Sequence, residues 1–259
     1  MDIGFKKHFS SLWNRYFSGA DLPIVFFYTN REDLGEPVKP AKNHRCVIGD
    51  LARVIRGRSL RFTVDTIGCA GGKRYLGFKK DILPYFEYFL SCGIPGRLEG
   101  ERYKKTPELV KEIMKTQPWT KAPAKNIVFQ RWDHIGPEED PAVVIFFATP
   151  NVLSGLFTLA NFDSVDPQGV IAPFGAGCAS IVMSPFLELK SENPRPVIGM
   201  FDVSARPYVK PQVLTFAVPW PKFVGMVDNM EESFLITKSW AKVRKRIKAD
   251  AKQNRAEKG

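Results

Sequence analysis

The chain has little of the chemistry that catalytic proteins commonly use. Its 259 residues include four cysteines and three histidines, and four cysteines are too few for a disulfide scaffold in a chain of this size. The sequence contains no Gly-x-Ser-x-Gly elbow, Walker loop or His-Glu-x-x-His motif, which disfavours hydrolase and nucleoside-triphosphatase functions. A Cys-x-x-Cys pair is also absent, so a zinc ribbon or a ferredoxin-type cluster is not indicated.

Long apolar runs are missing as well. The longest, residues 142–148, is far shorter than the roughly 20 residues that span a bilayer. Residues 1–8 lack the apolar core of a secretory signal. We therefore expect a cytoplasmic protein with free thiols and no membrane partner.

Apolar content and positive charge are plentiful. Apolar residues make up 44% of the chain and aromatic residues 12%, which is enough for a substantial core. The net charge is +11, and residues 238–259 alone carry nine basic and two acidic residues. A solvated helix is the commoner form of such a tail, and an arm that binds nucleic acid is the rarer one. We keep nucleic-acid binding through the tail as a disfavoured alternative.

Hydrophobic periodicity and turn residues predict an α/β or α+β fold with a mixed sheet and flanking helices. We interpret residues 1–237 as a single domain of two related halves, about 22–120 and 126–237, and residues 238–259 as a basic helical tail. The predicted helices are residues 3–18, 46–56, 82–90, 107–116, 151–162, 178–190 and 221–235, and the predicted strands are 22–28, 60–65, 127–132, 142–149, 170–174, 196–201 and 212–218.

A repeated pattern of chemistry suggests the duplication. Cys46 is followed 23 residues later by Cys69, and Cys178 is followed 24 residues later by Asp202. Each second residue precedes small residues, a base and a tyrosine. Two similar half-sites could therefore face each other across a cleft.

Glycine-rich turns beside these cysteines are typical of anion sites, because successive backbone N–H groups and a helix N-terminus favour negative charge. The same environment would lower a thiol pKa. For each cysteine alone, burial as an inert small residue is the better interpretation. The predicted ligand-binding residues are Cys46, Cys69, Gly71, Gly72, Lys73, Arg74, Gly177, Cys178, Asp202 and Arg206.

Our first hypothesis is a protein that binds a small anionic ligand or cofactor in the cleft. The alternative is a cysteine- or metal-dependent enzyme in the same place, in which Cys46, Cys69, Cys178 and Asp202 would hold a metal, an iron–sulfur cluster or a thiol-reactive cofactor. Asp202 at a cysteine-equivalent position argues against a closed four-sulfur site. A homodimer is kept as an alternative assembly.

Several of these motifs together resemble the family called domain of unknown function 169. The resemblance spans roughly residues 20–237. It implies an α/β ligand- or cofactor-binding protein of prokaryotic, largely anaerobic type, without a settled activity. The family's second half usually carries a Gly-Cys-x-Gly-Ser-Arg-like element, where residues 201–206 here keep the arginine and lack the thiol. The motifs that carry the resemblance are Arg45-Cys46, Cys69-Ala70-Gly71-Gly72 with Leu76-Gly77-Phe78, Gly177-Cys178 with Pro185, and Ser204-Ala205-Arg206 leading to Val218-Pro219.

Overall fold

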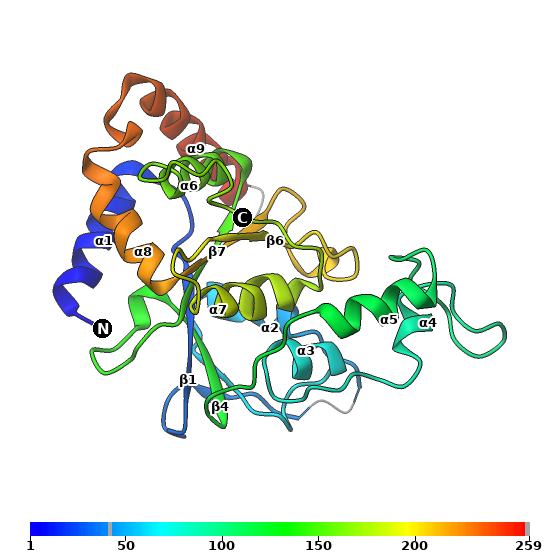
Figure 1. Ribbon diagram of the computed structural model, residues 1–259. Coiled ribbons are helices and arrows are strands. Elements are labelled where there is room, and N and C mark those ends of the chain that lie inside the picture. The colour runs from blue at the N-terminus through cyan, green and yellow to red at the C-terminus, as the bar shows by residue number, and fades with distance from the viewer. Residues whose placement is uncertain (41–42, 257–259) are drawn as a thin grey trace.

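The computed structural model describes residues 1–40 and 43–256 and is organised around one mixed sheet (Figure 1). Within these ranges the sheet has seven strands in the order β2-β3-β4-β1-β5-β7-β6. The pairing of β2 with β3 is parallel and the other strand pairs are antiparallel. The strands are β1 Ile24–Thr29, β2 Glu36–Pro37, β3 Leu60–Phe62, β4 Asn126–Arg131, β5 Val143–Ala148, β6 Val197–Gly199 and β7 Leu214–Pro219.

Helices cover both faces of this sheet, which confirms the predicted α/β class. The π-helix η2 continues directly into α7. No helix of the described residues is long and apolar enough to cross a membrane. The helices are α1 Ile3–Tyr16, α2 Val47–Ile55, α3 Ala70–Tyr75, α4 Phe86–Phe89, α5 Pro107–Thr116, α6 Pro150–Ala160, η2 Ala179–Met183, α7 Ser184–Glu188, α8 Trp220–Asp228 and α9 Lys238–Ala256; short 3-10 turns are η1 Trp132–His134, η3 Arg206–Tyr208, η4 Asn229–Glu231 and η5 Phe234–Ile236.

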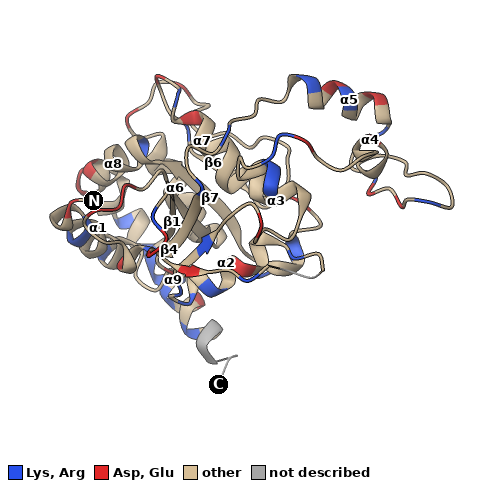
Figure 2. Cartoon of the chain, turned by 90° about the horizontal axis from the view of Figure 1, so that it is seen from below, with Lys and Arg blue, Asp and Glu red and all other residues tan. Residues whose placement is uncertain are grey.

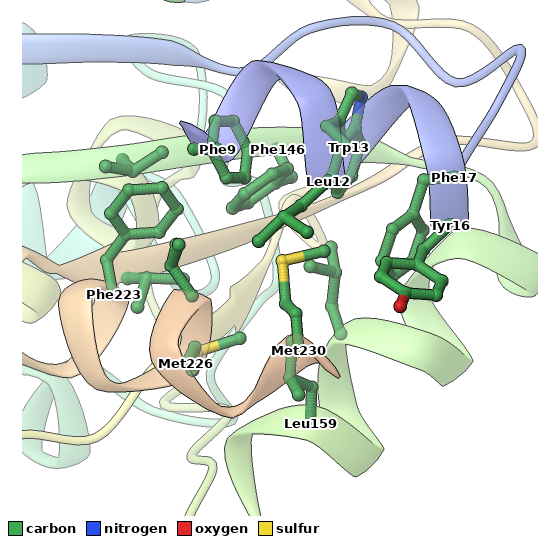
Figure 3. Close-up of a cluster of buried hydrophobic side chains, with 14 of the residues drawn as sticks. Phe9, Leu12, Trp13, Tyr16, Phe17, Phe146, Leu159, Phe223, Met226 and Met230 are labelled. Atoms are coloured by element: carbon green, nitrogen blue, oxygen red, sulfur yellow. The ribbon is translucent and has the colours of Figure 1, made fainter. Parts of the chain in front are cut away.

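Alternating side chains of the central strands divide the core into two clusters. Val25 and Val144 point to one face, whereas Phe26 and Ile145 point to the other, as the two-residue period of a strand requires. The first cluster joins α1, α6, α8 and α9, and Figure 3 shows its aromatic and methionine side chains around Phe146. The second cluster lies under α2, α3 and η2, and it contains Cys178.

The sheet repeats its own register on either side of the central β1–β5 pair. Outward from that pair, β4 and β3 follow β1, and β7 and β6 follow β5. Matching strands have equal lengths, and Leu60 lies opposite Phe129 as Val197 lies opposite Ala217. The parallel pairing of β2 with β3 corresponds to an isolated parallel bridge between Ile171 and Val197. This arrangement has the form of a pseudo-twofold axis between β1 and β5. β4, whose residues 126–131 were assigned to the second half of the predicted duplication, lies on the same side of this axis as β1, β2 and β3.

The basic helix α9 is part of the core and not a separate tail. Trp240 and Ile247 are buried in the first cluster, and Trp240 Nε1 donates to the Tyr16 carbonyl at 2.9 Å. A Cβ on Gly155 would lie only 2.3 Å from the Trp240 ring. The prediction of a helix was right, but the boundary at residue 238 does not separate a packed domain from a solvated extension.

Residues 79–120, which we name the arm, carry α4 and α5 and stand away from the sheet in both views (Figures 1 and 2). The predicted helix 82–90 is reduced to the four residues of α4. Pro84 disfavours helix before it, and Tyr85 has a φ of 62°. The predicted helix 107–116 has those bounds, with Thr106 as its N-cap and proline at its first turn.

Candidate functional site

Three of the four cysteines lie at the start of a helical segment. Cys46 and Cys69 are the N-caps of α2 and α3, whereas Cys178 already has helical backbone angles, in the helical turn that begins at Gly177 and continues as η2. The Cys69 thiol accepts a hydrogen bond from the Gly72 N–H at 3.2 Å, so sulfur takes the place of the usual oxygen of a capping residue. Cys92 is exposed on the arm and is the fourth free cysteine.

The thiols of Cys46, Cys69 and Cys178 lie within electrostatic reach of one another. Burial raises the pKa of Cys178 well above that of an ordinary thiol, and the neighbouring Cys69, Cys46 and Asp202 raise it further. Burial also raises the pKa of Cys46, with contributions from Cys69 and Asp202. The fold thus brings Cys46, Cys69, Cys178 and Asp202 together, and we name these four residues the thiol cluster.

Asp202 connects its own loop to the segment that carries Gly177. Its carboxylate accepts from the Gly177 N–H at 2.9 Å, and from the Ser204 N–H and hydroxyl at 3.0 and 2.8 Å. The chain enters this loop through Met200, a buried residue with a φ of 72°. A left-handed conformation is costly for a large side chain and recurs at functional sites.

The glycines beside the cysteines serve close packing instead of turn geometry. Gly71 and Gly72 lie in the first turn of α3, where a glycine-rich turn after the strand 60–65 was predicted, and neither glycine has a left-handed φ. A Cβ on Gly72 would lie 2.9 Å from the Cys69 sulfur. A Cβ on Gly177 would lie 2.9 Å from the Ala205 Cβ. Both glycines therefore let a helix start approach its neighbour.

The expectation of a lowered thiol pKa is wrong for Cys178. The first turn of a helix favours a thiolate by a modest amount, typically about 0.3–1 kcal/mol. Desolvation of a fully buried charge is much more costly, and Asp202 adds repulsion. The Cys46 and Cys178 thiols are consequently protonated at neutral pH.

Two tyrosines that were not among the predicted binding residues border the thiol cluster. Burial raises the pKa of Tyr75 to about 12, and Cys178 and Asp202 are among its electrostatic neighbours. Tyr103, on the arm, has a raised pKa through burial, with Ser204 and Asp202 among the groups that affect it. The arm therefore reaches the loop that carries Asp202. Sequence offers no signal for this contact, because 99 residues separate Tyr103 from Asp202.

A second contact of the arm holds it on the other loop of the site. The Lys104 ammonium lies 3.9 Å from the centroid of the Phe174 ring, a distance at which a cation–π attraction operates. Phe174 belongs to the segment that leads to Gly177 and Cys178. Residues 103–104 thus connect the arm to both loops of the thiol cluster.

The side-chain hydrogen bonds of two predicted basic residues, Arg74 and Arg206, go to backbone carbonyls and not to the thiols. The Arg206 guanidinium donates to the backbone carbonyls of Val213 at 2.5 Å and Met200 at 3.5 Å, and to others in its own loop. Arg206 therefore organises the loop that holds Asp202. Arg74 is buried and donates to the Lys80 carbonyl, and Lys73 is half-buried on α3.

The side chains as they stand do not form a metal site. Among the described residues, no group of three or more His, Cys, Asp or Glu side chains is arranged to hold a metal ion. The thiol cluster therefore combines three soft sulfur donors with one carboxylate, close to one another but without a coordination geometry. A role for these residues in binding a metal stays a prediction.

The fold and the thiol cluster define an α/β protein that gathers cysteines at helix N-termini on one face of a sheet. The sequence model of one family, domain of unknown function 169, described as uncharacterised ArCR, matches residues 22–229. The match covers well over half of the chain, and the chain belongs to this family. No curated protein and no solved structure matches the sequence.

Proposed function

We propose that this protein binds a small ligand or cofactor through the thiol cluster, with Cys46, Cys69 and Cys178 as the contacting thiols. The observation that supports the proposal is the convergence of Asp202 and three cysteines that lie at helix starts, from segments as far apart as Cys46 and Asp202. Inert buried cysteines have no reason to gather in this way. The location of the protein in the cytoplasm is part of this proposal, and its four free cysteines agree with a reducing compartment.

The chemistry of the cluster favours a thiophilic ligand over an anion. Thiols with raised pKa values beside a carboxylate offer no positive charge to an anion. A soft metal ion, an iron–sulfur cluster or a thiol-reactive cofactor instead binds sulfur directly, and a metal displaces the thiol protons on binding. We therefore narrow the anticipated ligand at this site to a thiophilic one.

Binding is preferred to thiol-based catalysis for the same reason. A cysteine nucleophile acts as the thiolate, and catalytic cysteines have lowered pKa values. Cys46 and Cys178 show the opposite shift. A thiolate nucleophile at Cys46 or Cys178 is therefore disfavoured.

A titration with Cd²⁺ under argon tests the proposal, because cadmium thiolate bonds absorb in the ultraviolet. The wild-type protein should bind Cd²⁺ with a charge-transfer absorption and release protons. Cys69→Ser and Cys178→Ser should each lower the affinity at least about tenfold, since a ligand is lost. Cys92→Ser is the matched control because Cys92 is exposed on the arm. Equal affinity in all four proteins would refute the proposal.

Native mass spectrometry of protein purified without oxygen then identifies a bound ligand directly. A mass adduct that is present in the wild type and in Cys92→Ser, and absent in Cys178→Ser, is the expected result. An adduct that survives Cys178→Ser would place the ligand elsewhere.

A further inference from the structure

A separate cavity of about 720 Å³ lies between the end of α3 and the arm. This volume is within the range of small-molecule pockets, about 300–1,000 Å³. None of the four residues of the thiol cluster lines it. Its walls combine apolar side chains, among them Phe86, Met114 and Trp119, with basic ones.

Arg74 supplies a buried cation to this cavity. Only 3% of its surface is exposed, and its Nε is buried without a hydrogen-bond partner. Within the part of the chain that the structure describes, no carboxylate forms an ion pair with its guanidinium. A buried charge without a counterion is costly, so a ligand that brings an anionic group would relieve the cost.

One face of α5 adds further positive charge. Lys111 and Lys115 are four residues apart, and Met114 lies between them on the same face of the helix. Lys111 is 3.7 Å from the partly buried Glu87, and Lys115 is 3.3 Å from the exposed Glu112, which does not line the cavity. Together with Lys80 and Arg74 the cavity has four basic side chains against two acidic ones, Asp81 and Glu87, a net charge of about +2 at neutral pH.

We propose that this cavity binds a small amphipathic anion, with a carboxylate or phosphate at Arg74 and an apolar body against Phe86, Met114 and Trp119. Arginine suits such a group because its guanidinium can donate two parallel hydrogen bonds to one carboxylate or phosphate. Trp119 is held in place by its own hydrogen bond, from Nε1 to the Arg74 carbonyl at 3.0 Å. The site goes beyond the proposed function and does not depend on it.

Calorimetric titration with undecanoate and with decyl phosphate at low ionic strength tests the assignment. Both carry the same alkyl chain, so the ligand that binds more tightly identifies the preferred anionic group. Arg74→Met should raise the dissociation constant of the tighter-binding ligand at least about tenfold. The double variant Lys111→Met with Lys115→Met should weaken it about threefold to tenfold, and it keeps the assignment testable where Arg74→Met does not fold.

Two controls separate this site from others. Lys105→Met removes an exposed lysine of the arm that does not line the cavity, and its affinity should equal that of the wild type. Cys178→Ser should also keep the affinity, so a failure of the thiol-cluster proposal leaves this result untouched. The assignment is overturned if neither amphiphile binds at 1 mM or below, on the order of −4 kcal/mol. It is equally overturned if Arg74→Met and the double variant bind as tightly as Lys105→Met.

Discussion

Trp132 and Trp220 lie at matching positions after β4 and β7, and their rings stack with centroids 6.4 Å apart and 24° between the planes. Their backbones repeat one hydrogen bond: the Trp132 N–H donates to the Pro23 carbonyl at 2.9 Å, and the Trp220 N–H donates to the Ala142 carbonyl at 3.0 Å. Pro23 directly precedes β1, and Ala142 directly precedes β5. The repeated register of the sheet therefore extends to the residues that end its inner strands.

Replacing the two tryptophans should affect stability unequally. Trp132 is fully buried and its Nε1 donates to the Ser10 hydroxyl at 3.1 Å, so Trp132→Ala should lower the free energy of unfolding by about 3–5 kcal/mol. Trp220→Ala should lower the free energy of unfolding by less, because Trp220 is only partly buried. Urea unfolding followed by circular dichroism measures both, and equal losses would contradict this account of the packing.

A methyl group at Gly72 should be poorly tolerated. Its Cβ would meet Ile67 Cγ2 at 2.8 Å, the Cys69 sulfur at 2.9 Å and Val47 Cγ2 at 3.0 Å. Gly72→Ala should therefore destabilise the fold by about 1–3 kcal/mol. Gly225→Ala, inside α8 with nothing within 4 Å of the added Cβ, is the control. It should be neutral or stabilising by up to about 1 kcal/mol, as thermal unfolding can show.

The buried thiol of Cys178 should make the fold sensitive to alkali. Its folded pKa lies above the unfolded value of about 9, so its contribution to stability is complete below pH 9 and is lost as pH rises beyond it. The loss approaches about 1.4 kcal/mol per pH unit for one proton. The free energy of unfolding between pH 8 and 10 should fall less steeply in Cys178→Ala than in the wild type. Parallel curves would show that Cys178 ionises as it does in the unfolded chain.

Release of the arm should expose the thiol cluster. Lys104→Ala removes the contact with Phe174, and loss of one cation–π attraction of about 0.5–2 kcal/mol should raise the population of open molecules severalfold. Labelling with iodoacetamide, read by peptide mass spectrometry, should then become faster at Cys69 and Cys178. Labelling of the exposed Cys92 should stay unchanged and serves as the internal control.

The contribution of α9 to stability and the role of its positive charge can be tested separately. Trp240→Ala should cost about 3–5 kcal/mol, because the ring is buried and bonded to the Tyr16 carbonyl. Lys245→Gln and Lys252→Gln on the same helix should leave stability within about 0.5 kcal/mol. If the double lysine variant lost affinity for a labelled oligonucleotide while keeping its melting temperature, nucleic-acid binding through α9 would be supported; unchanged affinity would remove that alternative.

Local sequence was sufficient for the elements that local chemistry controls. The helix 107–116 follows from its Thr106 cap and apolar spacing, and the strands β4 and β5 follow from their β-branched and aromatic runs. The short helix α3 was missed because Gly71 and Gly72 are poor helix formers. At Gly72 the close approach of Val47 in α2 and of the nearby Ile67 leaves no room for a side chain, so glycine suits that position.

The sequence by itself determined the α/β class, the main helices and strands, and the spacing that pairs Cys46 with Cys178, because these depend on periodicity and on caps read over a few residues. Only the tertiary structure decided that burial keeps Cys178 protonated, that α9 belongs to the core, and that the arm brings Tyr103 to Asp202. Desolvation and contact across 99 or more residues depend on how distant segments pack, and no local pattern encodes them.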